Sequence, residues 1–573
     1  MKIKQTPGSI YQEYMNDIDW KTAIGFVRKW PEFSRFIEGN QWPAPTEETK
    51  YMPRPVINIC DQTVENKTSN ILSQQLKMQF RVKELPEDAT EVNEIAQDFT
   101  DMAESTWYET LQDTLTEDMV RDTVSLGTGI LHYYFDNNYN GGTYTKYIGK
   151  ICGEDIDPMD LILGNNQLKP YQFQKQPFVT IRRRKDVNEV VEQAKKTGED
   201  WELIQPSKSV DTTEKYDNAR VESRNTSEVE TFTKYFRENG ELYWVEVTKE
   251  ATVVKKTMYK PDLKGLEDVK FTLYPVVMNV FKYKRKCAYG RSMIEDIIPN
   301  QKALNWGLGM QLLSVQQTAW PKIIAKVGAL AQTITNVPGE VITDQYQGGG
   351  GDGVKYMQMP NTPATASVLT QNIMDMTRNV VGVSEVSTGE SIGANMAASA
   401  IIALQNQAQK PNDAYMRIVV ETVKRIGEIW EEFYKCFYNT PRPIKGKDDR
   451  GKPVTKMFEG EKGRGVEFDL MVDVGPSSMF SESLQISVLD NYADRQWIDK
   501  FTHASNMPTA VLPQAIREQF EKEKEQAEEQ AELQQLMQQQ AAEQKAIIDQ
   551  QTATQPMGGI PPMEGQMPPP IMG

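Results

Sequence analysis

Apolar and aromatic side chains recur at helical spacing through the first 125 residues. The spacing predicts a helical start in which most rings face a core, and those rings are Trp20, Phe26, Trp30, Phe33 and Phe36. The same period predicts a second amphipathic helix over residues 56–80 and a long third one from about 89 to 125. Gly127 and Gly129 then end the helical pattern.

From residue 130 the period changes to the alternation that is typical of strands. Asn-Gly-Gly at 140–142 and Glu-Asn-Gly-Glu at 238–241 stand between runs of β-branched and aromatic residues, which predicts two hairpins. A short helix is predicted near 187–197. We therefore expect a β-rich unit after the helical start.

Helical spacing returns after Gly290 and predicts one long helix up to about Thr318. A segment of β-branched runs and turn residues, up to about residue 360, is predicted to be a small α/β insertion. The remaining predicted elements are helices over 364–383, 395–410, 415–438 and 480–520, and a short β element within 465–478. The expected fold class is α+β and mainly helical, with long helices, a Gln/Glu-rich terminal helix and a disordered Pro/Met/Gly tail over 521–573.

Composition narrows the function. The 573 residues include 80 acidic and 64 basic side chains, which gives a net charge of −16. A protein that coats nucleic acid needs a surplus of Lys and Arg, so this composition argues against that role. No apolar run approaches the roughly 18 residues of a membrane helix, and the start lacks the apolar centre of a signal peptide, so we expect a soluble chain without a membrane partner.

Few residues are available for metal or redox chemistry. The four cysteines lie far apart, which fits neither zinc-ligand spacing nor a dense disulfide framework and favours a reducing compartment. Two histidines, His132 and His503, are too few for a triad or a multi-histidine metal site. We therefore expect no catalytic residue, no metal and no cofactor.

Three motifs have a simpler interpretation than catalysis. The run GGGGDG at 348–353 lacks the GK[ST] ending of a phosphate loop, so a flexible turn is favoured. The carboxylate pairs Asp155/Asp157 and Glu295/Asp296 are favoured as chance neighbours among 80 acidic residues.

Two basic runs leave alternatives open. The run at 181–186 and the cluster formed by Lys282, Lys284, Arg285 and Lys286 are suited to contact phosphate. A solvated strand edge or an intersubunit ion pair is an equally good interpretation.

Several segments, in this order, resemble the portal proteins of tailed bacteriophages, the head-to-tail connector family. They are RKWPEFSRFIEGNQW, PRPVINICDQTVENKTSNIL, DPMDLILG, YPVVMNVFKYKRKCAYGRSMIEDIIPNQKALN and GVSEVSTGESIGANMAASAIIALQNQAQKP. The phrase YGRS followed by an acidic pair, IPNQ and a helix is typical of these proteins. The resemblance covers about residues 30 to 440.

The resemblance implies a subunit made of wing, stem, clip and crown. The implied parts are a wing, helical and then β-rich, over 1–290, a first stem helix over 291–318, a clip over 319–363, a second stem helix over 364–383, a channel loop over 384–394, wing and crown helices with a short β element over 395–520, and the terminal helix and tail over 521–573.

The resemblance also implies partners and site residues. It implies a ring, usually of twelve copies, at one vertex of the virion capsid, assembled in the host cytoplasm, through which double-stranded DNA passes during packaging and ejection. The implied partners are the major capsid protein, the terminase large subunit, which would hydrolyse ATP, and a head-tail adaptor or tail protein. The implied DNA-facing residues are Ser387, Thr388, Glu390 and Ser391, and the implied clip docking residues are Val341, Ile342, Asp344 and Gln345.

Two alternatives stay open from the sequence. One is another structural protein of the virion head, such as a capsid or scaffold protein. The other is a Mg²⁺-dependent nucleic-acid enzyme that uses scattered carboxylates. The portal interpretation explains two long helices around an insertion, which neither alternative requires.

Overall fold

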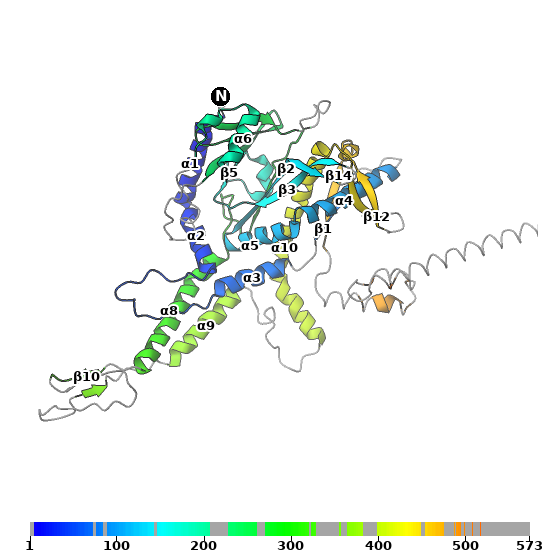
Figure 1. The fold of residues 1–573 in the computed structure, drawn as a ribbon. Coiled ribbons are helices and arrows are strands. Elements are labelled where there is room, and N and C mark those ends of the chain that lie inside the picture. The colour runs from blue at the N-terminus through cyan, green and yellow to red at the C-terminus, as the bar shows by residue number, and fades with distance from the viewer. Residues whose placement is uncertain are drawn as a thin grey trace, which may run out of the picture. The chain divides into compact units, whose positions relative to one another are not determined.

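The computed structural model describes residues 5–72, 76–83, 89–142, 146–206, 227–260, 270–319, 323–327, 354–356, 364–381, 398–447 and 453–474, and isolated positions between 486 and 516. The chain divides into a unit of Met1–Gly475 and a unit of Pro476–Gly573. All elements below belong to the first unit (Figure 1). Most of the predicted helices over 480–520 and the whole predicted tail lie outside the described residues.

The helical start is confirmed. Helices α1 (Pro7–Ile24) and α2 (Phe26–Ile37) meet at Gly25, whose φ of +92° suits a residue without a β-carbon. Four of the five predicted core rings are buried and Trp20 is partly buried against them. Phe26 stacks on Trp30 at 4.6 Å between centroids, and Tyr289 closes the cluster.

The predicted helix over 56–80 is wrong in its second half. Helix α3 (Ile59–Ile71) ends at Ile71, and the rest of the predicted helix contains strand β1 (Leu76–Val82) instead. Met78 and Phe80 alternate with more exposed neighbours because β1 pairs antiparallel with β14 (Phe468–Val474).

The predicted helix over 89–125 is two helices, α4 (Ala89–Glu109) and α5 (Gln112–Ser125). The break is at Leu111, which has φ +52° although it is not glycine. Trp107 Nε1 donates to Asp113 Oδ1 at 2.9 Å across the break, and the buried Tyr133 hydroxyl donates to Gln112 at 2.8 Å. These side-chain contacts thus stabilise a turn that the sequence does not mark with a glycine or a proline.

The β-rich unit is confirmed and consists of two antiparallel sheets. One has the order β3-β2-β9, from β2 (Thr128–Gly141), β3 (Tyr147–Asp155) and β9 (Val276–Val280). The other runs in chain order through β4 (Leu161–Leu163), β5 (Phe178–Asp186), β6 (Glu228–Glu238), β7 (Glu241–Val247) and β8 (Thr252–Met258). The hairpin at 239–240 has φ +54° and +85°, as its Asn-Gly pair predicts. Short elements flank the second sheet: η1 (Pro170–Lys175), α6 (Val187–Thr197) and η2 (Trp201–Leu203).

The long helices follow the sheets. Helix α8 (Ile294–Ala319) and helix α9 (Ala364–Val381) lie side by side (Figure 1). Of the predicted insertion between them, the structure describes the antiparallel pair β10 (Ile323–Ala325) and β11 (Val354–Tyr356). The two helices predicted over 395–438 are one helix, α10 (Ala398–Phe437), which continues through Pro411. The remaining elements are β12 (Arg442–Lys447), β13 (Pro453–Phe458) and η3 (Gly460–Gly463).

One large core joins these parts. Trp430 and Phe433 of α10 are fully buried. Trp430 contacts the rings of Trp107 on α4 and Tyr133 on β2, and Phe433 contacts the ring of Phe271. The fold class is therefore α+β, as predicted.

Candidate functional site

The basic cluster lies in the loop between β9 and α8, which we call the basic loop, residues 282–286. The loop is closed by the Arg291 amide, which donates to the Lys282 carbonyl at 2.9 Å, and by the Cys287 amide, which donates to the Lys284 carbonyl at 3.3 Å. Lys286 at its tip has φ +55°. Four of its five residues are cationic, and the fifth, Tyr283, is 50% exposed.

Two of the four cations have partners within the chain. Lys282 Nζ lies 3.5 Å from Asp296, and Lys284 Nζ lies 4.8 Å from the centre of the Phe26 ring. Arg285 and Lys286 are exposed, and the described residues include no ion pair to either of them. The loop therefore presents cations to solvent, and these cations are suited to bind a phosphate or an acidic protein surface.

The cations of the other basic run are engaged within the chain. The run lies on β5 beyond its pairing with β4, where residues 182–186 pair with β6, and its cations meet carboxylates of the same chain. Arg182 pairs with Asp160 at 2.6 Å and Glu230 at 3.1 Å, and Lys185 pairs with Glu246 at 2.7 Å. Three interpretations of this run are open from the sequence: a phosphate contact, a solvated strand edge and an intersubunit ion pair. None of them holds for Arg182, whose side chain is 5% exposed and paired with carboxylates of its own chain.

A buried polar network joins the two sheets at His132. Its Nδ1 lies 2.9 Å from Glu154 Oε1 and 2.7 Å from Arg183 Nη2, and its Nε2 lies 3.1 Å from the Tyr235 hydroxyl. Burial and the neighbouring Arg183 guanidinium lower the pKa of His132 to about 4. The imidazole is thus neutral at pH 7 and acts as a hydrogen-bonded part of the core.

This network predicts a loss of stability in acid. The unfolded chain takes up a proton at the ordinary imidazole pKa of 6.5, and folded His132 does so only near 4. The stabilisation is complete above pH 6.5 and is lost as the pH falls toward 4, by about 3 kcal/mol. We expect His132→Asn to remove this step from a plot of unfolding free energy against pH. Parallel curves for the two proteins would contradict it.

The residues of both carboxylate pairs interact with other charged side chains of the chain. Burial and nearby carboxylates raise the pKa of Asp155 and of its neighbour Asp122, because two buried carboxylates in contact do not both ionise at neutral pH. Glu295 lies 2.6 Å from Lys29, and both Glu295 and Asp296 pair with Arg291. Among the described residues no group of three or more side chains is placed to hold a metal ion.

Helices α8 and α9 form an antiparallel hairpin. Asn300 donates to Thr377 at 3.1 Å and Gln311 donates to Thr370 at 2.9 Å, so the two sequences run in opposite directions. Their other faces carry exposed large apolar side chains, which are Trp306, Met310, Leu312, Val315, Val368, Leu369 and Met376. So many large apolar side chains exposed on two neighbouring helices are typical of surfaces that another protein covers.

The other predicted site residues lie outside the described part of the chain. They are the channel-loop residues Ser387, Thr388, Glu390 and Ser391, and the clip docking residues Val341, Ile342, Asp344 and Gln345. Their assignments stay predictions.

Comparison with known proteins identifies the family. A family model for the phage P22-like portal protein matches residues 30–558, and the search of curated proteins finds no match. No helix in the described ranges is both long and apolar enough to cross a bilayer. The matched family is structural rather than enzymatic, and its members belong to the virion capsid. The match spans most of the sequence, so this chain belongs to the P22-like family of phage portal proteins.

Proposed function

We propose that this portal protein closes into a ring of twelve copies at one capsid vertex and conducts double-stranded DNA during packaging and ejection. The observation that supports it best is the α8/α9 hairpin. The hairpin packs internally through polar contacts and leaves seven large apolar side chains exposed. Neighbouring copies around a ring would cover such a surface on every subunit.

The proposal assigns a part to each segment. Residues 1–290 form the wing, 291–318 and 364–383 the stem, and 319–363 the clip. Residues 384–394 form the channel loop and 395–520 wing and crown. The bounds of α8 and α9 are compatible with two stem helices.

Charge supports a weak grip on DNA. Each copy carries a net charge of −16, so a ring concentrates negative charge, and an acidic lining repels phosphate and lets the duplex slide. A surplus of Lys and Arg along the bore would instead hold the duplex. From Ser387 onward, the proposed channel loop carries a single charged residue, which is Glu390. Gly389 and Gly393 would let its backbone adjust as the duplex moves.

Docking is the second part of the proposal. The clip, with Val341, Ile342, Asp344 and Gln345, would meet the terminase large subunit and later the head-tail adaptor or tail protein, and the wing would meet the major capsid protein. ATP hydrolysis would belong to the terminase, and this chain would need no cofactor.

Mass measurement tests the ring. Analytical ultracentrifugation of the full chain should show one closed assembly of about twelve copies, because ring interfaces leave no free ends. A strictly monomeric or dimeric protein across a range of salt and protein concentrations would contradict the proposal.

Deleting residues 521–573 should leave the rings intact. The deleted segment is rich in Gln, Glu, Pro and Met with few apolar anchors, and the proposed stem and wing remain. The mass and symmetry of the truncated protein, measured beside the full chain, check this. Collapse of the truncated protein to monomers would show that the terminal segment holds the ring together.

A further inference from the structure

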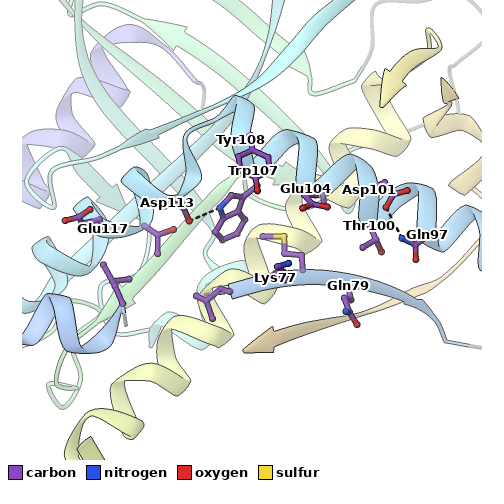
Figure 2. A pocket seen from close by; sticks show the side chains of 15 residues that line it. Lys77, Gln79, Gln97, Thr100, Asp101, Glu104, Trp107, Tyr108, Asp113 and Glu117 are labelled. Carbon is purple, nitrogen blue, oxygen red and sulfur yellow. Dashed lines mark hydrogen bonds between the residues drawn. The ribbon is translucent and has the colours of Figure 1, made fainter. Parts of the chain in front are cut away.

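A groove of about 560 Å³ opens between α4, α5 and β1, and we call it the acidic groove (Figure 2). The residues that line it are Leu72, Leu76, Lys77, Met78, Gln79, Gln97, Thr100, Asp101, Ala103, Glu104, Trp107, Tyr108, Asp113, Thr116 and Glu117. Four of these are acidic and one is basic, so the lining carries an excess of negative charge. Its volume suits a few side chains of a docking segment.

The lining combines carboxylates with aromatic rings. Glu104 and Glu117 are exposed, and the described residues include no ion pair to either one. Trp107 is oriented by its hydrogen bond to Asp113 at 2.9 Å, and Tyr108 beside it is 69% exposed (Figure 2). Carboxylates next to aromatic faces form a surface that binds Arg and Lys side chains by charge and by cation–π contact.

The basic loop has the complementary composition. It offers Arg285 and Lys286 to solvent and carries the half-exposed Tyr283. The other basic run is engaged by carboxylates of its own chain, as shown above for Arg182 and Lys185.

The loop and the groove lie at opposite ends of α5. The first half of α5 lines the groove with Asp113 and Glu117, whereas at its last turn the Val124 carbonyl accepts from the amide of Met293, just beyond the loop. The 14 residues of α5 span about 21 Å at 1.5 Å per residue. The basic loop is part of a ten-residue segment that the pairing of Lys282 with Arg291 folds back on itself, and such a segment does not reach across that distance. The basic loop therefore does not fill the groove of its own chain.

We infer that the basic loop of one subunit docks into the acidic groove of the next subunit. A ring needs a heterologous interface, in which one patch meets a different, complementary patch on the neighbouring copy. The chain carries two such patches of opposite charge, separated along α5. The inference rests on the proposed ring and assigns part of its subunit contact.

Charge reversal tests the inference. We expect Glu104→Lys with Glu117→Lys to raise the protein concentration at which half of the subunits are assembled by about tenfold. Arg285→Glu with Lys286→Glu should do the same. A chain that carries all four substitutions should assemble nearly as well as the original, because the charges are exchanged. Controls with the same charge change at exposed positions elsewhere, Glu192→Lys with Glu202→Lys and Lys175→Glu with Lys196→Glu, should assemble normally.

Disulfide crosslinking between subunits tests the same contact in case a charge reversal disturbs folding. In a Cys152→Ser background, Tyr108→Cys with Arg285→Cys should give a ladder of covalent oligomers on mild oxidation. Tyr108→Cys with Lys196→Cys should give none. Intact rings that assemble unchanged in both reversed pairs and give no ladder would overturn the docking inference and leave the ring standing. An unmodified chain that never assembles would overturn the ring itself, and the docking inference with it.

Discussion

Replacing Lys21 with methionine is expected to lower the free energy of unfolding by about 3 to 5 kcal/mol. The Lys21 side chain is fully buried, and its Nζ lies 2.8 Å from Asp17. The same Nζ donates to the carbonyls of Pro158, Met159 and Leu161 at 3.0, 3.1 and 2.8 Å. Methionine keeps the length of the side chain but removes the cationic partner of Asp17 and the Lys21 donor to the Pro158 and Met159 carbonyls. Asn166 still donates to Asp17 at 3.0 Å, and the Tyr289 hydroxyl still donates to the Leu161 carbonyl at 2.8 Å. The substitution therefore removes the Lys21 contacts that join α1 to the residues 158–161 at the start of β4.

Urea unfolding followed by tryptophan fluorescence measures this loss. Lys29→Met is the matched control, because Lys29 pairs with Glu295 at 2.6 Å while its side chain remains 34% exposed. The control should cost less than about 1 kcal/mol. Adding Asp17→Asn to Lys21→Met should recover part of the loss, since no unpaired charge is then buried. A Lys21→Met protein as stable as the control would contradict the account of this contact.

Placing glutamate at Val315 and Leu369 together is expected to convert rings into folded monomers. Both side chains are apolar, 62% and 60% exposed, and lie on the two helices of the proposed stem. In a ring they would be covered by neighbouring copies, where an unpaired carboxylate is strongly unfavourable. In a monomer they face water, so the free energy of unfolding should change by less than about 0.5 kcal/mol.

The control adds the same charges beside these positions. Gln316→Glu with Asn372→Glu places two carboxylates on exposed polar positions of the same helices and should leave the rings assembled. Light scattering coupled to size exclusion reports the mass of each variant. Rings that persist in the Val315→Glu, Leu369→Glu protein would remove the hairpin from the subunit interface.

The elements that were predicted well are those whose signals are local. The hairpin at 239–240 follows from an Asn-Gly pair between alternating runs, and α8 and α9 follow from long helical periods. The errors arise where strand pairing or particular side-chain contacts, rather than the local hydrophobic period, determine the backbone. Strand β1 needs β14 as its partner, and the break at Leu111 needs Trp107, Asp113 and the core around Tyr133.

The candidate site shows the same limit. The two basic runs have nearly the same composition, but β5 brings Arg182 to Asp160 and Glu230, whereas Arg285 and Lys286 remain exposed. Sequence alone has no means to separate them, because the carboxylates that engage the first run come from other segments of the chain, the turn before β4 for Asp160 and β6 for Glu230. The acidic groove was not predicted for a similar reason, since three elements supply its lining.

Electron-microscope class averages of the purified full chain test the central claim most directly. They should show closed rings of about twelve copies around an open bore at least as wide as a DNA duplex, roughly 20 Å. The bore of a three-dimensional reconstruction should carry no continuous belt of Lys and Arg, because such a belt would hold the duplex in place. Isolated particles, open filaments, or rings whose bore is blocked or lined with positive charge would contradict it.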